Sequence, residues 1–350
     1  MRKFSVSCIA AVLLLQAPSG MAQTAIDAAS RAQFIDNLVR ELNDNYVFPE
    51  VAGKLEAALR AKQKRGDYDR AADAQGLAVL LTSELQAVSG DLHLNVRYSD
   101  TPAPPRLTGP RPAPTAEDEA RFRARAKSMN YGLGTVEKLP GNIGYLETQG
   151  FGPVKYVDKA LSAAMTQLAD SDALIIDMRG NGGGSPDSIA FLSSYLFDKR
   201  THLNNLYWRE GERTEEFWTT EDVPGKKYGQ QKPVYVLTGP RTFSGAEEFS
   251  YNLQQLKRAT LIGETTRGGA NPGGMRQLTP HFSVFVPSGR AINPISKTNW
   301  EGTGVTPDVK VAAADALVSA QKMALAKLAA DERDPQKAQL LRARLAELSK

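Results

Sequence analysis

Hydrophobic residues recur every three to four positions through the first part of the chain. Phe34, Leu38 and Leu42 are spaced four apart, and the same spacing returns in residues 51–59 and 77–88. This period places apolar side chains on one face of a helix, which then packs against a core. We therefore predict helices between residues 26 and 88.

The period shortens to two between Leu92 and Tyr98, where apolar residues alternate with His93 and other polar residues. Such alternation is typical of a half-buried strand and predicts that His93 projects from its polar face. Six of the next fifteen residues, 101–115, are proline. This composition predicts a loop or linker, because proline lacks the backbone N–H that regular structure needs.

Short apolar runs alternate with helical patterns beyond Gly141. Strands followed by helices indicate parallel crossover units, so we predict an α/β fold whose sheet is rich in parallel strands. Ligand sites in such sheets lie beyond the carboxyl ends of the strands. The predicted strands are residues 143–146, 173–178, 234–237 and 260–262, and the predicted helices are residues 154–168, 245–256 and much of the tail from 312 to 349.

These patterns divide the chain into five parts. The predicted divisions are a signal peptide (1–22), an N-terminal helical region ending in the His93 strand (23–100), a proline-rich linker and helix (101–141), an α/β core (142–312) and a C-terminal helical tail (313–350).

The first 22 residues have the three-part pattern of a secretory signal. Arg2 and Lys3 precede an apolar run at 8–15, and small residues follow up to Ala22, the predicted last residue removed. A membrane anchor would need about 20 apolar residues. We expect an exported protein, periplasmic or secreted, without stable membrane insertion after cleavage.

Composition excludes several classes. The chain has 350 residues, of which 41% are hydrophobic, and a single cysteine, Cys8, so no disulfide framework or thiolate metal cluster is expected. Its formal charge is +4, from 43 Lys and Arg against 39 Asp and Glu. Removing Arg2 and Lys3 with the signal leaves 41 against 39, so the charge predicts no nucleic-acid partner.

Ser244 stands where a predicted strand turns into a helix. A serine at such a turn exposes its hydroxyl, and the free N–H groups of the first helical turn point at a substrate oxygen. This arrangement suits an acyl-transfer nucleophile. Ser244 followed by Glu247 is also the pattern of a helix capping box, and from these residues alone both interpretations stay open.

A glycine-rich run, residues 180–184, follows another predicted strand. Neither a phosphate-binding loop nor a dinucleotide fingerprint fits, because no Gly-Lys-Ser/Thr follows and Ser185 replaces the last glycine. The run could supply N–H groups to an oxyanion or anion, or form a tight strand-to-helix turn.

Three histidines limit the choice of general base. His93 is the natural candidate, although a lone histidine is often structural. His202 lies in a polar, loop-like stretch and receives no role, and His281 is interpreted as structural. Glu301, in the turn-rich segment 299–305, could orient His93 or belong to a surface turn.

Several motifs occur in a characteristic order. Together they resemble the S41 peptidase family, the tail-specific and C-terminal processing proteases, and most of all its branch related to interphotoreceptor retinoid-binding protein and the tricorn protease core. The resemblance extends over about residues 30–315 and implies a ClpP/crotonase-like core. The motifs are Gly141-Asn142-Ile143-Gly144-Tyr145-Leu146, Asp177 through Gly184, Thr242 through Phe249, Gly263 through Ala270, and Asn299 through Asp308.

The resemblance implies a serine hydrolase with Ser244 as nucleophile. Processing proteases of the family use a lysine about two dozen residues later, where this chain has Gly269, and Arg267 is too firmly protonated to act as a base. Tricorn-like members use a histidine and a downstream glutamate, which match His93 in Asp91-Leu92-His93 and Glu301. Leu92 departs from the serine that precedes the histidine in tricorn-type sites.

The remaining expectations also follow from the resemblance. Gly183 and Gly245 are the expected oxyanion donors, with Gly182 or Gly184 as alternatives to Gly183. No metal or organic cofactor is expected, and the substrate would be a peptide or protein. The segment between Asp100 and Gly141 is too short for a PDZ domain. A non-catalytic carrier of hydrophobic ligands or peptides and an esterase remain alternatives, and the sequence predicts no oligomeric state.

Overall fold

The computed structural model describes residues 27–71, 73–104 and 113–349. The predicted signal peptide, residues 1–22, lies outside the described residues, as does the middle of the proline-rich segment, 105–112. In the described ranges, no helix is both long enough and apolar enough to cross a membrane.

Three helices at the start of the described chain pack around one apolar core, which confirms the helical prediction for this region. The apolar stripe lies in this core: Phe34, Leu38 and Leu42 are each at most 1% exposed. Asp27 and Asp73 accept backbone N–H bonds at the starts of two of the helices. The elements are α1 (Ala28–Asn45), α2 (Pro49–Lys64), a 3-10 turn η1 (Asp67–Arg70) and α3 (Ala74–Ser89).

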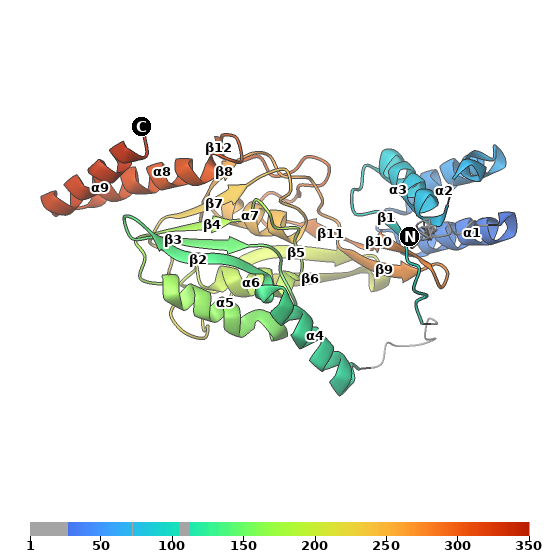
Figure 1. Cartoon of the computed structure of the whole chain (residues 1–350), viewed down its shortest axis with the longest axis horizontal. Coiled ribbons are helices and arrows are strands. Elements are labelled where there is room, and N and C mark those ends of the chain that lie inside the picture. The colour runs from blue at the N-terminus through green and yellow to red at the C-terminus, as the bar shows by residue number, and fades with distance from the viewer. Residues whose placement is uncertain (1–26, 72, 105–112, 350) are drawn as a thin grey trace, which may run out of the picture.

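These helices pack on a small antiparallel sheet made from distant parts of the chain. Its order is β1-β10-β9, from β1 (Asn95–Tyr98), β9 (Gly273–Gln277) and β10 (Phe282–Pro287). Val96 and Val284 close the apolar core beneath the helices. In Figure 1 this sheet joins α1–α3 to the rest of the molecule.

The prediction that His93 belongs to a strand is wrong. The strand begins at Asn95, and His93 lies in the turn before it. Asp91 makes this turn by accepting the backbone N–H of His93 at 2.9 Å, a local bond that competes with strand pairing.

A six-stranded sheet forms the centre of the molecule and confirms the predicted α/β class. All its pairs are parallel except that of β2 with β3. Its order is β12-β8-β7-β4-β3-β2, from β2 (Leu133–Leu139), β3 (Ile143–Thr148), β4 (Ala173–Asp177), β7 (Val234–Thr238), β8 (Thr260–Gly263) and β12 (Val309–Lys310).

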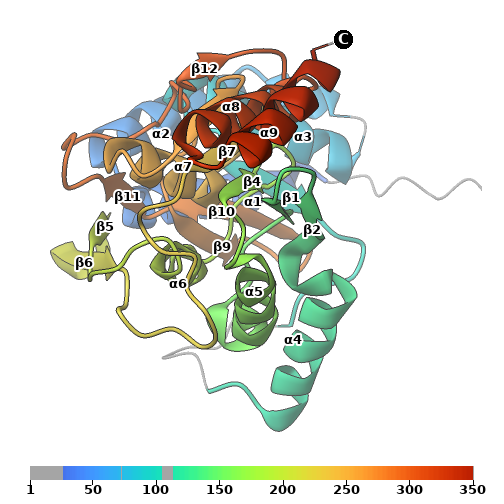
Figure 2. The same ribbon diagram turned by 90° about the vertical axis from the view of Figure 1, so that its left-hand side faces the viewer.

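Helices cover both faces of this sheet, as continuous apolar strands require. Along β4, Leu174 and Ile176 pack in one core with the first set of helices, whereas Ala173 and Ile175 pack in another with α8. Figure 2 shows the two layers. The first set is α5 (Val154–Leu168), α6 (Pro186–Ser194) and α7 (Gly245–Gln255), and the other face carries α8 (Ala316–Asp331) with α9 (Pro335–Glu347) beside it.

An antiparallel hairpin that the sequence did not predict lies beside the core. It consists of β5 (His202–Trp208) and β6 (Arg213–Trp218), joined by the turn η3 (Glu210–Glu212), and β11 (Gly289–Ile292) pairs with β5. His202 is therefore in a strand and not in a loop. Its ring stacks on Trp218 with centroids 4.2 Å apart, which gives this histidine a structural role.

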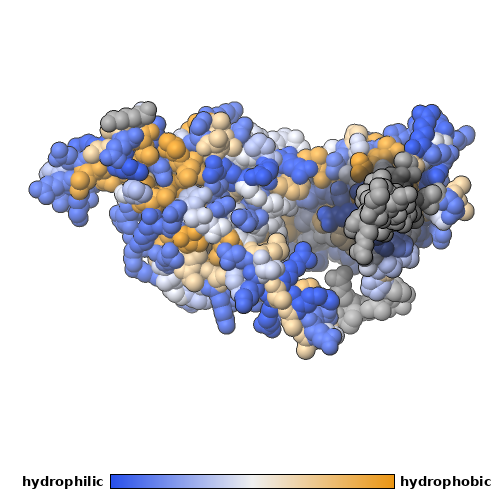
Figure 3. All heavy atoms as spheres, viewed as in Figure 1, coloured by the Kyte–Doolittle hydropathy of each residue, from blue (hydrophilic) through white to orange (hydrophobic). Residues whose placement is uncertain are grey.

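Helix α4 (Ala116–Ser128) extends away from the core in Figures 1 and 2 and has no buried residue. A 3-10 turn, η2 (Asn130–Gly132), connects it to β2. Figure 3 shows hydrophobic residues among the hydrophilic ones along α4. Phe122 and Met129, at and just after this helix, are 38% and 58% exposed.

Candidate active site

Ser244 lies at a strained turn between β7 and α7. Its backbone has φ 53° and ψ −119°, a region that residues with a side chain rarely adopt. Such strain persists only where neighbouring bonds hold it, and it concentrates at functional sites. Here the N–H of Phe243 donates to the carbonyl of Asn181 at 3.1 Å, and the N–H of Ser244 donates to Glu247 Oε2 at 2.8 Å.

Glu247 joins this turn to the loop that follows β8. It is fully buried, and besides Ser244 its carboxyl group accepts bonds from Thr266 Oγ1 at 2.5 Å, Gly268 N at 2.6 Å and Gly269 N at 2.9 Å. Burial raises the pKa of Glu247, against the opposite effect of these donors. The capping bond expected from the sequence is thus one of four, and no local pattern indicates the other three.

The glycine-rich run packs directly against the serine. β4 and β7 are neighbours, so the segments after their carboxyl ends meet, as predicted. Gly183 has φ +97°, and a Cβ at this position would lie 2.6 Å from the Gly245 nitrogen and 2.9 Å from Ser244 Cβ. Only glycine fits this approach.

The backbone N–H groups of Gly182, Gly184 and Gly245 have no acceptor within the described part of the chain. Those of Gly184 and Gly245 lie close together, because a Cβ on Gly245 would lie 3.0 Å from the Gly184 nitrogen. The N–H of Gly183, by contrast, donates to Asn181 Oδ1 at 2.8 Å. Gly183, the donor expected from the sequence resemblance, is therefore engaged within the protein in this conformation.

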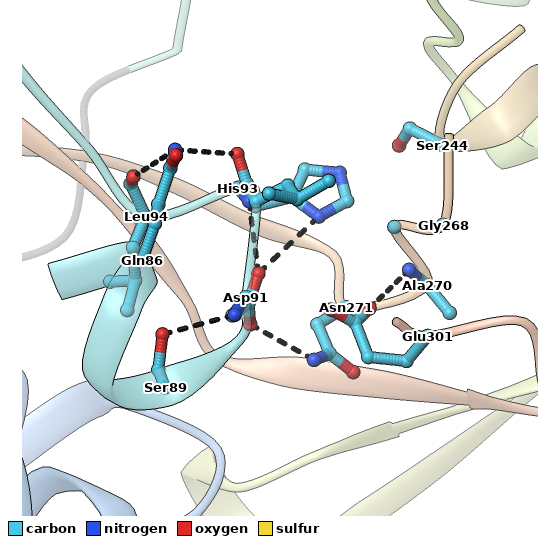
Figure 4. A network of polar contacts seen from close by, with 12 residues as sticks. Gln86, Ser89, Asp91, His93, Leu94, Ser244, Gly268, Ala270, Asn271 and Glu301 are labelled. Atoms are coloured by element: carbon cyan, nitrogen blue, oxygen red, sulfur yellow. Dashed lines mark hydrogen bonds and ion pairs between the residues drawn. The ribbon is translucent and has the colours of Figure 1, made fainter. Parts of the chain in front are cut away.

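Packing positions the imidazole of His93. Its ring lies 4.5 Å from that of Phe243 and 5.8 Å from that of Phe285, measured between centroids. Nδ1 is 3.7 Å from Asp91 Oδ1, and neither ring nitrogen has a hydrogen-bond partner among the described residues. Figure 4 shows Asp91 on one side of the ring and Ser244 on the other.

Asp91 is a fixed, buried carboxylate. It is 1% exposed, and in addition to the His93 N–H it accepts bonds from Tyr46 Oη at 3.1 Å and Asn271 Nδ2 at 2.9 Å. These donors come from three separate parts of the chain: the end of α1, the turn itself and the loop before β9. The motif Asp91-Leu92-His93 predicts no separate role for Asp91.

Glu301 lies in the same group. Its Oε2 accepts the N–H of Ala270, and its Oε1 is buried without a partner among the described residues. Burial, together with the negative charge of Asp91, raises the pKa of Glu301 to about 8. The segment around it is not a surface turn, because Trp300 is 2% exposed and donates from Nε1 to the carbonyl of Gly269 at 2.8 Å.

Asp91, His93 and Glu301 are the residues that would hold a metal ion, because one ligand atom from each lies within 4.8 Å of the others. The hydrogen bonds already made by Asp91 account for its burial without a cation. The same three groups can also serve as an imidazole with two carboxyl neighbours, which is the arrangement that orients a general base.

Ser244 and His93 line one cavity of about 480 Å³. This volume is in the usual range of ligand sites. No hydrogen bond joins the two side chains in this structure, and catalytic contacts are often longer before substrate binds. Gly269 also lines the cavity; a Cβ there would lie 2.3 Å from the ring of Phe243 and 2.7 Å from His93 Cε1.

Comparison with known proteins identifies the family to which this fold belongs. Residues 142–311 match the family model described as peptidase family S41, and residues 28–129 match the model of the N-terminal domain of this peptidase in eukaryotic interphotoreceptor retinoid-binding protein. The chain belongs to peptidase family S41.

Among curated relatives, the carboxy-terminal processing protease CtpA of Bacillus subtilis (strain 168) is 30% identical over 134 residues, which are 38% of this chain and 27% of that protein. The match thus spans about a quarter of the relative's length. Among solved structures, mature CPAF superposes on this chain with a TM-score of 0.59. The two are 12% identical, over 86% of this chain and 97% of that one. The tricorn protease has a TM-score of 0.52 and 16% identity, over 92% of this chain and 37% of that one. These structures share the fold.

Proposed function

We propose that this chain is an exported serine peptidase that cleaves peptide bonds through Ser244, His93 and Glu301. The observation that carries the proposal is the shared cavity in which a strained serine and a partner-free imidazole face the same space. Membership of peptidase family S41 supports the reaction class.

In the first step, Ser244 Oγ attacks the carbonyl carbon of the scissile bond while His93 accepts the hydroxyl proton. Because Nδ1 faces Asp91, Nε2 is the nitrogen left for the serine. The carbonyl oxygen becomes an oxyanion that accepts bonds from Gly245 N–H and, of the glycine alternatives, Gly184 N–H, which are free of other acceptors within the described chain.

In the second step, the C–N bond breaks, and His93 returns the proton to the leaving amine. Water then attacks the acyl group on Ser244 and gives its proton to His93. The bond between the acyl carbon and Ser244 Oγ breaks, and His93 returns that proton to Oγ. Glu301 and Asp91 orient the imidazole and stabilise its positive charge in both halves of the reaction.

Labelling with a fluorophosphonate probe tests the nucleophile and the base. We expect the wild type to be labelled at Ser244, Ser244→Ala to be unlabelled, and His93→Ala to be labelled far more slowly. Asn205→Ala, in β5, is a control outside the cavity lining. Equal labelling of wild type and Ser244→Ala would overturn the proposal.

Export is tested separately. The pattern in residues 1–22 supports cleavage after Ala22. Expression of the full chain in a bacterial host, followed by fractionation and N-terminal sequencing, should give a periplasmic product that begins at Gln23. A cytoplasmic product retaining Met1 would contradict export.

The alternative function, a carrier of hydrophobic ligands or peptides, is favoured by one further feature. A second cavity, of about 710 Å³, lies between α4 and the start of α5 and is lined by Phe122, Met129, Tyr131 and Phe151, and it reaches Gly183. If the protein is a carrier, an apolar fluorescent fatty acid should bind there stoichiometrically, with Phe122→Ser weakening it, and peptides should remain uncleaved.

A further inference from the structure

A second acidic residue of α7 lies in the cavity of Ser244 and has no role in the mechanism above. Glu248 is four residues after Ser244, so the two side chains lie on one side of the first helical turn, and both line the cavity. Glu248 is 5% exposed, and its Oε1 has no hydrogen-bond partner among the described residues.

Nothing in the described surroundings neutralises this carboxyl group. Its polar neighbours are the amides of Asn204 and Asn252, and no lysine or arginine contributes to its environment. Burial raises the pKa of Glu248 to about 7, with the two amides acting in the opposite direction. A buried carboxyl group without a cation is costly, and an apolar residue would serve packing better. The unpaired carboxyl group of Glu248 therefore indicates that a ligand binds beside it.

The other residues around the cavity indicate which ligand fits. No lysine or arginine lines it. Glu215 lines it but is paired with Arg213 at 3.4 Å, so Asp187 and Glu248 are the carboxyl groups of the lining that are left for a ligand. Trp208 and Phe217 supply aromatic walls. An alkyl chain ending in a cation matches this combination, because aromatic faces pack against its methylene groups and attract the charge, and carboxylates accept its hydrogen bonds.

We propose that Glu248 determines specificity by pairing with a lysine or arginine side chain on the residue whose carbonyl Ser244 attacks. The proposal rests on the proposed peptidase function and adds the class of substrate. A substrate with an acidic side chain meets like charge here, and one with an apolar side chain leaves Glu248 unpaired, so both are disfavoured.

Two peptidyl diphenyl phosphonates test this assignment, one with a lysine side chain and one with norleucine, which has the same stem without the charge. Each reacts covalently with an active-site serine, so the rate of phosphonylation of Ser244 reports how well the side chain is accepted. We expect the lysine probe to react at least about tenfold faster than the norleucine probe with the wild type.

Glu248→Gln should lower the lysine rate about 100-fold, as expected when one partner of a buried charge pair is removed, and leave the norleucine rate nearly unchanged. Glu216→Gln, an exposed glutamate of β6 outside the cavity lining, is the matched control and should retain the wild-type preference.

The outcomes separate the two proposals. If a fluorophosphonate labels wild-type Ser244 but both peptidyl probes react equally fast, the specificity assignment is overturned and the peptidase proposal stands. Equal slowing of both probes in Glu248→Gln would show a structural role and also overturn it. The wild-type comparison needs no variant, so a poorly folded Glu248→Gln does not remove the test. Absence of fluorophosphonate labelling would overturn the proposed function itself.

Discussion

The ring of His93 occupies the space that a side chain at position 269 would need. A Cβ on Gly269 would lie 2.7 Å from His93 Cε1 and 2.3 Å from the ring of Phe243. The sequence resemblance aligns Gly269 with the lysine expected in the processing proteases. The imidazole of His93 and a side chain at position 269 could not both fit beside Phe243. The histidine therefore requires glycine at this position.

Gly269→Ala should therefore disable the base while leaving the serine in place. The added methyl group has to displace the imidazole or the ring of Phe243, and a misplacement of about 1 Å costs about 100-fold in rate. We expect fluorophosphonate labelling to slow by that factor. Gly274→Ala is the matched control, because a Cβ there meets nothing within 4 Å. Unchanged labelling of Gly269→Ala would contradict the assigned position of His93.

Glu247→Gln should destabilise the protein and slow labelling together. Each carboxyl oxygen of Glu247 accepts two bonds, and an amide would turn its NH₂ toward two donors. Leaving these buried groups unsatisfied costs about 2–4 kcal/mol of unfolding free energy. The measurements are thermal denaturation and the labelling rate.

Glu264→Gln is the comparison for Glu247→Gln, because this exposed carboxylate accepts the Ala313 N–H. It should change neither quantity by much. A Glu247→Gln protein as stable as the wild type would show that the four bonds do not hold the serine turn.

Much of the core could be predicted because its signals are local. The glycine-rich run and Ser244 each follow a buried strand, and the rule that sites lie beyond the carboxyl ends of parallel strands brings them together. The helix at 154–168 matches α5 at both ends. Periodicity and chain order are sufficient for such elements.

The elements that the sequence did not predict correctly depend on pairing between distant segments. β1 pairs with β10, and β5 pairs with β11, so neither strand is defined by its own sequence alone. His93 was predicted in a strand, but its backbone N–H donates to the Asp91 side chain and this bond forms a turn instead. The contacts of Asp91 with Tyr46 and Asn271 join three distant segments, and no local pattern indicates them.

Gly183→Ala should remove activity through the backbone. The residue has φ +97°, and its Cβ would lie 2.8 Å from the carbonyl oxygen of Phe243 and 2.6 Å from the Gly245 nitrogen, so the turn must open. We expect loss of labelling and a lower melting temperature. Gly53→Ala in helix α2, where a Cβ meets nothing within 4 Å, should raise stability by about 0.5–1 kcal/mol with labelling unchanged. A fully labelled Gly183→Ala protein would contradict the close packing of this turn against Ser244.

The pair of Asp91 and Glu301 predicts opposite changes of stability and activity with pH. Because burial and Asp91 raise the pKa of Glu301 from 4.5 to about 8, the folded protein keeps a proton that the unfolded chain loses, and stability falls as pH rises between these values. Glu301→Gln removes this titration, so its melting temperature should exceed that of the wild type increasingly up to about pH 8.

Activity should rise over the upper part of that range, because ionised Glu301 orients and stabilises the His93 cation better than the neutral acid does. Labelling rates of the wild type should therefore increase through about pH 8, and Glu301→Gln should lack this step. Asp91→Asn, which also removes the charge that raises the Glu301 pKa, should move the step to lower pH and slow labelling at every pH. A step that persists unchanged in Glu301→Gln would assign it to another group and leave Asp91 as the carboxylate that orients His93.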